Sequence, residues 1–99
     1  MLFDFDTDEL RELYETGACR RLRLHHDVIV AFFTVMQRIR TAQNERYLRY
    51  YKGLRMEKLR GHREGQYSVR LNDQYRLIFT IEGDITGSYL LIIEIVDYH

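Results

Sequence analysis

Four stretches of the chain alternate apolar and polar residues or are apolar almost throughout, and they predict β-strands. The first is short, LFDF at Leu2–Phe5. Two follow each other closely, QYSVRL at Gln66–Leu71 and QYRLIFTI at Gln74–Ile81. The last, SYLLIIEIV at Ser88–Val96, is apolar nearly throughout, which is typical of a strand covered on both faces.

The alternation also assigns side chains to the two faces of each strand. Arg76 falls on the face opposite Leu77, in the middle of its strand. In the preceding strand, Ser68 and Arg70 fall opposite their apolar neighbours. Asn72–Asp73 joins the two strands, and both residue types tolerate the positive φ that a tight hairpin needs.

Three stretches with helical spacing lie between the first strand and the others. The stretch DTDELRELYETG predicts a helix that Asp6 or Thr7 caps and Gly17 ends. Apolar residues recur at three- and four-residue steps from about Asp27 to Ala42, which predicts a longer helix. A shorter helix is expected over Asn44–Gly53. Residues 1–99 are therefore expected to form one α+β domain, with an N-terminal strand and two to three helices packed on a curved antiparallel sheet.

Charge is spread unevenly along a chain that is neutral overall. Residues 1–16 carry six acidic side chains and one basic one, whereas residues 46–76 carry nine basic side chains and three acidic ones. Tyrosines are interleaved with these bases, a combination that suits contact with RNA phosphates and stacking on RNA bases. A solvated basic face with the tyrosines in the core explains the same composition, and composition alone favours it.

Composition also limits the expected environment. The single Cys19 cannot form an internal disulfide, which favours a reducing cytosol and a cytoplasmic protein. No apolar run approaches the ~20 residues of a membrane span, and the amino end is acidic, unlike a signal peptide, so no membrane partner is expected. His25 and His26 are adjacent and on no ligand spacing, so no metal site is expected there.

The stretch LRGHREGQYSVRLNDQYRLIF contains a spaced set of residues: Leu-x-Gly, an arginine and a glycine, an aromatic residue before serine, an asparagine turn, and an aromatic–arginine pair. These are Leu59, Gly61, Arg63, Gly65, Tyr67, Ser68, Asn72, Tyr75 and Arg76. With the terminal DYH, the pattern resembles the HigB-type toxins of the RelE/ParE superfamily, the host-killing halves of bacterial toxin–antitoxin pairs. The likeness is strong over about residues 54–99, weaker over 9–17 and poor across 20–53.

The resemblance implies a RelE-like fold and a small endoribonuclease that cuts messenger RNA on the translating ribosome. In that family no metal or other cofactor is used. The RNA's own 2′-hydroxyl attacks the neighbouring phosphate, leaving a cyclic phosphate and a free 5′-hydroxyl. The same fold also hosts ParE-like toxins that act on DNA gyrase, and a non-catalytic member would bind only an antitoxin or RNA. Both stay open as alternatives.

Arg76 is the first candidate for stabilising charge on the phosphorane. The planar fork of a guanidinium matches phosphate oxygens and stays charged throughout the reaction. A strand would hold it rigidly. We expect its side chain to be mostly exposed, so that its removal costs little stability. An exposed arginine that stabilises the sheet through a cross-strand pair is the alternative.

The proton-transfer groups are expected at the carboxyl end. His99 exchanges a proton near neutral pH, Asp97 can orient it or act as a base itself, and Tyr98 can donate to a phosphate or stack on a base. The apolar last strand should be pinned in the sheet and deliver this triplet beside Arg76; a frayed end is the alternative. Some relatives carry a histidine two residues before the Leu of Leu-x-Gly, where this chain has Glu57. The general base therefore stays open among His99, Asp97 and Glu57.

The remaining basic side chains predict RNA contact that does not depend on sequence. The candidates are Lys58, Arg60, Arg63 and Arg70. His62 is expected to be a solvated loop residue. The resemblance further implies a cognate HigA-like helix-turn-helix antitoxin, the ribosome and mRNA as partners, with operator DNA bound only through the toxin–antitoxin complex.

Overall fold

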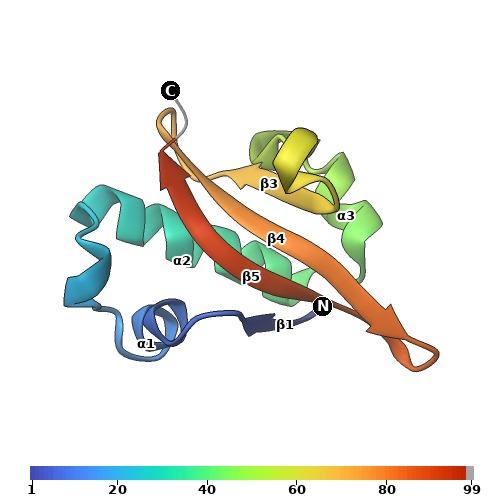
Figure 1. Ribbon diagram of the computed structural model, residues 1–99, viewed down its shortest axis with the longest axis horizontal. Helices are drawn as coiled ribbons and strands as arrows, with labels where there is room; N and C mark the ends of the chain where they lie inside the picture. The colour runs from blue at the N-terminus through green and yellow to red at the C-terminus, as the bar shows by residue number, and fades with distance from the viewer. Residues whose placement is uncertain (98–99) are drawn as a thin grey trace.

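The computed structural model describes residues 1–97, except for the side chain of residue 84. Its centre is a five-stranded sheet with the order β1-β5-β4-β3-β2 (Figure 1). The strands are β1 (Leu2–Phe5), β2 (Glu57–Lys58), β3 (Gln66–Arg70), β4 (Tyr75–Asp84) and β5 (Gly87–Asp97). The expected α+β fold and the four predicted strands are confirmed. Two features were not expected: the two-residue strand β2, and the parallel pairing of β1 with β5.

Three α-helices complete the domain: α1 (Asp8–Thr16), α2 (His26–Thr41) and α3 (Glu45–Tyr50). The helix α1 begins after Thr7, whose hydroxyl accepts a hydrogen bond from the Leu10 N–H at 3.3 Å, and it ends at Gly17 in the left-handed conformation, as predicted. None of the helices among residues 1–97 is long and apolar enough to cross a bilayer.

The helix α3 is shorter than predicted. It begins after Asn44, whose side chain caps it, but it ends at Tyr50 instead of continuing to Gly53. The N–H of Tyr51 closes the last turn, and the chain then enters the short 3₁₀ turn η2 (Lys52–Leu54), which contains Gly53. Two further 3₁₀ turns, η1 (Arg20–Leu22) and η3 (Gly61–Arg63), lie in the connections.

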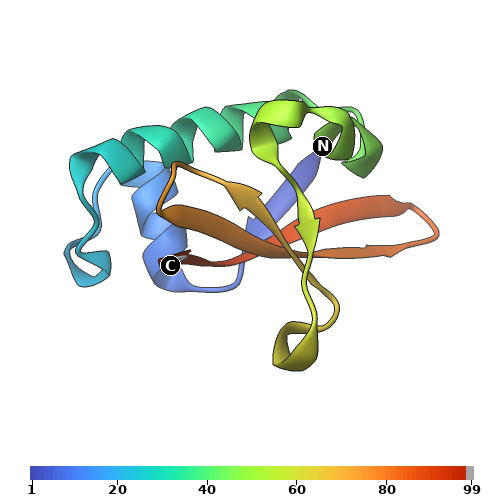
Figure 2. The ribbon, with the colours of Figure 1, turned by 90° about the horizontal axis from the view of Figure 1, so that it is seen from above.

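The hydrophobic core lies between the helices and one face of the sheet (Figure 2). Phe32 of α2 is fully buried with Leu77 and Phe79 of β4, and Leu10 of α1 joins them. The predicted alternation is therefore correct: Leu77 and Phe79 point to the helices, and Arg76 points to the opposite face. Because the helices cover only one face, residues of β5 such as Leu91 are only half-buried, and the predicted covering of both faces is incomplete.

Asn72 organises the connection between β3 and β4, although not with the expected positive φ. Among residues 1–97 the non-glycine residues with positive φ are Arg23 and Arg55, so Asn72 and Asp73 do not adopt it. Instead the Asn72 side-chain oxygen accepts hydrogen bonds from the N–H groups of Gln74 and Tyr75, at 2.9 and 2.7 Å. This Asx-type turn fixes the start of β4 directly before Arg76.

Candidate active site

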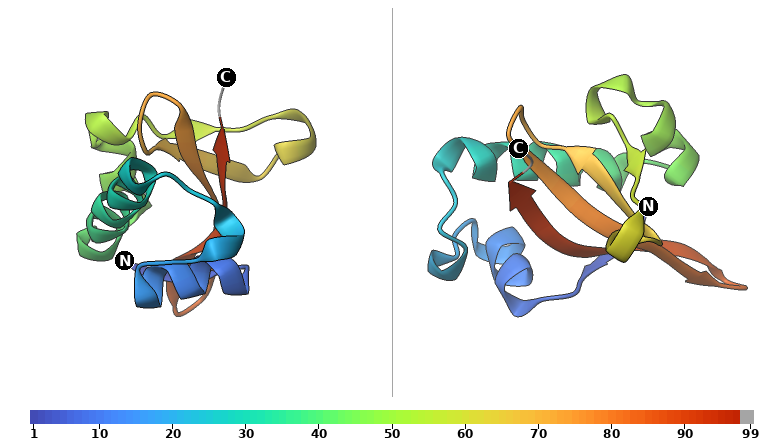
Figure 3. Two further views of the ribbon diagram at one scale, coloured as in Figure 1. Left: turned by 90° about the vertical axis from the view of Figure 1, so that its left-hand side faces the viewer. Right: turned by 45° about the horizontal axis from the view of Figure 1, so that its top comes forward.

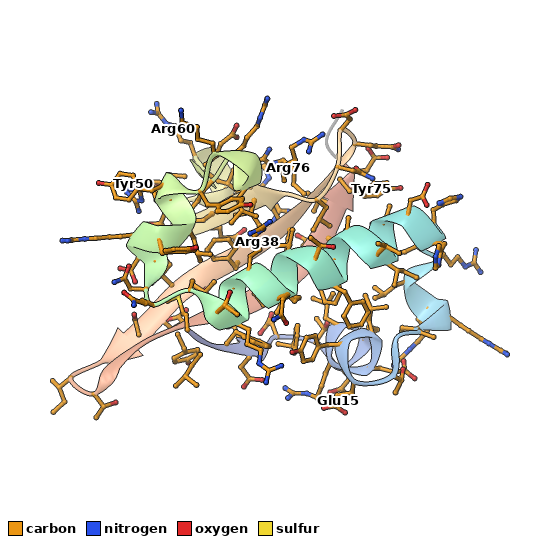
Figure 4. All side chains as sticks on the ribbon, turned by 180° about the vertical axis from the view of Figure 1, so that it is seen from behind. Glu15, Arg38, Tyr50, Arg60, Tyr75 and Arg76 are labelled. Carbon is orange, nitrogen blue, oxygen red and sulfur yellow. The ribbon has the colours of Figure 1, made fainter. Side chains whose placement is uncertain are left out.

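The side chain of Arg76 is buried, which corrects the expectation of a mostly exposed arginine. Only 8% of it is exposed, and it lies near the edge of the molecule between the labelled Arg60 and Tyr75 (Figure 4). Its Nε donates to the Ser68 hydroxyl at 2.8 Å, and its Nη2 donates to the backbone oxygen of Arg55 at 2.5 Å. Burying a charge is unfavourable unless hydrogen bonds compensate for the lost water, and these two acceptors provide that compensation.

The strand register explains why Ser68 meets Arg76. Arg76 of β4 pairs with Arg70 of β3, and Ser68 pairs with Ile78. Ser68 therefore lies on β3 in the diagonal position to Arg76, on the same face of the sheet. The second acceptor depends on Arg55, which adopts a φ of 45° at the end of η2. A left-handed arginine is uncommon, and here it directs a carbonyl group toward a buried guanidinium.

A small polar cavity of about 200 Å³ opens beside Arg76. It is lined by Arg55, Glu57, Arg70, Asn72, Asp73 and Arg76. Three guanidinium groups and two carboxylates thus surround it, and the side chain of Arg70 is ion-paired with Asp73. A cavity with a fixed guanidinium group at its wall suits the non-bridging oxygens of a phosphate. Glu57 is the only described member of the predicted proton-transfer set that lines the cavity.

The carboxyl end of β5 reaches the level of this cavity. Val96 pairs with Arg76 in the sheet, and Asp97 pairs with Tyr75. The Asp97 carboxylate accepts a hydrogen bond from the Gln74 side chain at 3.1 Å, and Asp97 does not line the cavity. Tyr98 and His99 lie outside the described residues, so their place beside Arg76 stays a prediction.

The four predicted RNA-binding side chains differ in their surroundings. Arg63 donates to Glu94 of β5 at 2.5 Å and to Gln66 at 2.9 Å, and Arg70 is paired with Asp73, so any contact of these two with phosphate competes with a carboxylate. Arg60 and Lys58 are exposed, and neither has an ion pair within the described part of the chain. Lys58 pairs with Tyr67, which places it on the opposite face of the strand from Glu57.

Sequence reasoning missed the groups that hold Arg76. The alternation placed Ser68 away from the apolar face of its strand, so the sequence contained a signal for this acceptor. The sequence contained no signal for the backbone oxygen of Arg55, because nothing in the residue type indicates a positive φ. Within residues 1–97, no cluster of three or more histidine, cysteine or acidic side chains could hold a metal ion.

Comparison with known proteins gives a consistent answer. The family model described as the RelE-like toxin of the type II toxin–antitoxin system HigB matches residues 3–99. Toxin HigB-1 of Vibrio cholerae serotype O1 is 35% identical over 91 residues, which cover 91% of this chain and 95% of that protein.

The chain belongs to the HigB-like toxin family. It is thus a toxin of a type II toxin–antitoxin system.

Solved structures agree on the RelE-like fold. A YafQ variant from E. coli superposes with a TM-score of 0.63 at 12% identity, over 96% of this chain and 90% of that one. The YoeB/ParE toxin from Agrobacterium tumefaciens gives a TM-score of 0.61 at 16% identity, with both chains fully covered. The YoeB–YefM complex from Staphylococcus aureus contains a chain with a TM-score of 0.55 at 17% identity, over 100% of this chain and 98% of that one.

Proposed function

We propose that this HigB-like toxin is a metal-independent endoribonuclease that cuts mRNA on the translating ribosome, with Arg76 holding the phosphate that reacts. The observation that carries the proposal is the buried guanidinium of Arg76, held by Ser68 and Arg55 at the wall of a polar cavity. A preorganised charge of this kind stabilises a transition state without first having to be oriented.

In the proposed reaction the 2′-oxygen of one nucleotide forms a bond to the adjacent phosphorus, and the bond from phosphorus to the 5′-oxygen of the next nucleotide breaks. A base accepts the 2′-proton, and an acid donates a proton to the departing oxygen. Glu57 is the base candidate that lines the cavity, with Asp97 and His99 as the other candidates. Tyr98 is proposed to contact the phosphate or stack on a base.

The chemistry is tested by incubating the toxin with ribosomes programmed with a defined mRNA and analysing the ends of the fragments. We expect a 2′,3′-cyclic phosphate and a 5′-hydroxyl. An mRNA with a single 2′-deoxy nucleotide on the 5′ side of the cut should stay intact, because it lacks the attacking oxygen. Fragments with 5′-phosphate ends would instead indicate attack by water and refute the mechanism. DNA damage in expressing cells without RNA cuts would favour the ParE-like alternative.

We also propose that the toxin binds a cognate HigA-like helix-turn-helix antitoxin, and that operator DNA is bound only through that complex. The family is defined by toxin–antitoxin systems, and a structural relative is a complex of YoeB with YefM. Co-expression with the neighbouring gene product should restore growth, and the two proteins should purify together. Failure of both would reject this partner.

A further inference from the structure

The helix α3 exposes aromatic and basic side chains together. Tyr47 is 50% exposed and Tyr50 is 80% exposed, and Arg46 and Arg49 are exposed beside them. Figure 4 shows Tyr50 projecting from α3 into solvent. Tyrosines are usually buried at least at their rings, so a helix that presents two of them to water indicates a surface that binds something.

Packing against the core accounts for the buried side of α3 but not for the exposed tyrosines. Leu48 is fully buried, and the ring of Tyr51 packs against the core with the Arg38 guanidinium 4.1 Å from its centre. These two residues anchor the segment at a three-residue spacing. Tyr47 and Tyr50 have the same spacing one position earlier, so they share a neighbouring stripe that faces outward.

The cations of this segment are not neutralised within the protein. Arg46, Arg49 and Lys52 have no ion pair and no side-chain hydrogen bond among residues 1–97, in contrast to Arg63 and Arg70 near the cavity. The one acidic residue of α3, Glu45, instead accepts a hydrogen bond from Ser88 of β5 at 3.3 Å. The exposed face of α3 therefore carries uncompensated positive charge next to two aromatic rings.

The cavity is lined at the start of β2, which α3 and η2 precede in the chain and η3 follows. Figure 3 shows α3 with η2 on one side, η3 on the other, and β2 running between them, and Figure 2 agrees. The start of β2 borders this site: Arg55, which follows η2, supplies its carbonyl group to Arg76, and Glu57, the first residue of β2, lines the cavity. The chain thus runs directly from α3 through η2 to Arg55 at the wall of the cavity.

We propose that the exposed face of α3 (Arg46, Tyr47, Arg49 and Tyr50) binds unpaired nucleotides of the same RNA strand that is cut, several nucleotides from the cut itself. The inference rests on the proposed function. The tyrosine rings stack on bases and the arginines contact phosphates, which is how single-stranded RNA is bound without sequence preference. The combination of exposed rings and unpaired cations favours RNA over an acidic protein, because bases use the tyrosine faces while the adjoining phosphates use the arginines.

The experiment measures binding of single-stranded RNA oligonucleotides made uncleavable by 2′-deoxy substitution, at two lengths of roughly 4 and roughly 12 nucleotides. Replacing both Tyr47→Ala and Tyr50→Ala should weaken binding of the long RNA about tenfold or more and leave the short RNA unaffected. Tyr47→Phe with Tyr50→Phe should retain the affinity, because phenylalanine still stacks. Replacing Arg46→Gln and Arg49→Gln should reduce the slope of affinity against salt by about 0.7 for each phosphate that an arginine no longer neutralises.

The matched control replaces two arginines outside this face, Arg20→Gln and Arg23→Gln, which remove equal charge and should leave the affinity for the long RNA nearly unchanged. Several results would overturn the inference. In binding, these are no binding of the long RNA by the unmodified toxin, equal losses for the two lengths, equal losses with phenylalanine and alanine, or an effect seen only with intact ribosomes. The last would assign α3 to ribosomal RNA, and binding only to the antitoxin would assign it to protein. A toxin that cuts RNA normally without these tyrosines would refute the inference and leave the proposed function standing.

Discussion

Arg76 is fixed by acceptors from two separate segments, the Ser68 hydroxyl of β3 and the Arg55 carbonyl after η2. The first follows from strand alternation, and the second from an arginine in the left-handed region. A side chain held at both Nε and Nη2 loses little further freedom when a phosphate arrives. That is the condition under which a charge contributes most to catalysis.

We predict that both Arg76→Lys and Arg76→Ala abolish toxicity, and that Arg76→Ala also lowers the free energy of unfolding by about 1–3 kcal/mol. Lysine carries the charge but lacks the planar fork, and alanine leaves the Ser68 hydroxyl and the Arg55 carbonyl without their donor. Growth of expressing cells and urea unfolding measure the two effects. The control Arg60→Ala, at an exposed position, should change stability by less than about 0.5 kcal/mol. A toxic lysine variant would show that the fork is not needed.

We predict that Ser68→Ala slows cleavage by lowering the turnover rate more than the affinity for programmed ribosomes. The alanine removes a hydrogen bond to a charged group at 2.8 Å, so the guanidinium is less well positioned while its charge remains. In a ¹⁵N-labelled sample the Arg76 Nε–H resonance should also shift. Thr80→Ala, on the neighbouring strand, is the control and should move neither quantity. An unchanged resonance in the Ser68 variant would contradict the hydrogen bond itself.

At the scale of elements, an ion pair connects the turn η3 to β5, which is not adjacent to it in the sheet. Arg63 of η3 forms an ion pair with Glu94 of β5. Glu94 pairs with Ile78 of β4, which is fully buried on the face of the sheet opposite the helices. The basic turn is thereby held against the sheet. The same contact places one carboxylate close to the surface proposed to receive phosphates.

We predict that Glu94→Gln tightens binding of single-stranded RNA and steepens its dependence on salt by about 0.7, because one more cation can contact phosphate. Glutamine retains an oxygen that accepts from Arg63, so η3 should stay in place. The loss of stability should not exceed about 1 kcal/mol, since the pair is partly exposed. Glu94→Ala also removes the acceptor for Arg63, so the affinity of this variant for single-stranded RNA should be lower than the affinity of the Glu94→Gln variant. Weaker RNA binding by the glutamine variant would mean that the charge of Glu94 is itself required.

Elements with a strong period were predictable from sequence, and irregular ones were not. The alternation in β4 placed Arg76 and Leu77 on opposite faces, because one register alone buries the apolar set. The strand β2 has two residues and no period to detect, yet it brings Glu57 to the cavity. The exposure of Arg76 was misjudged because burial depended on the fold of η2, which ends in a backbone conformation that the residue type does not indicate.

At the scale of the whole molecule, charge is separated between two sides. The net-negative residues 1–16 form β1 and α1, and of these α1 lies away from the end of β5, from α3 and from η3 (Figure 3). The backbone N–H of Phe5, and then Arg11, lower the pKa of Asp4, so the carboxylate of Asp4 stays ionised to lower pH. A neutral chain divided in this way is oriented by a polyanion before contact, with its basic side toward the RNA.

The end of β5 belongs to that basic side, and the last prediction concerns it. Deleting residues 97–99, or fusing a tag after them, should let expressing cells grow while the protein stays folded. Val96 still pairs with Arg76. Among the described residues, the deletion removes the last pair of the sheet, Asp97 with Tyr75, and the hydrogen bond from Gln74 to Asp97. Growth, thermal unfolding and cleavage on programmed ribosomes measure the effect. The control Ile85→Gly, at the exposed tip of the β4–β5 hairpin, should leave killing intact. Continued killing by the shortened chain would remove Asp97, Tyr98 and His99 from the mechanism and leave Glu57 as the base that the cavity offers.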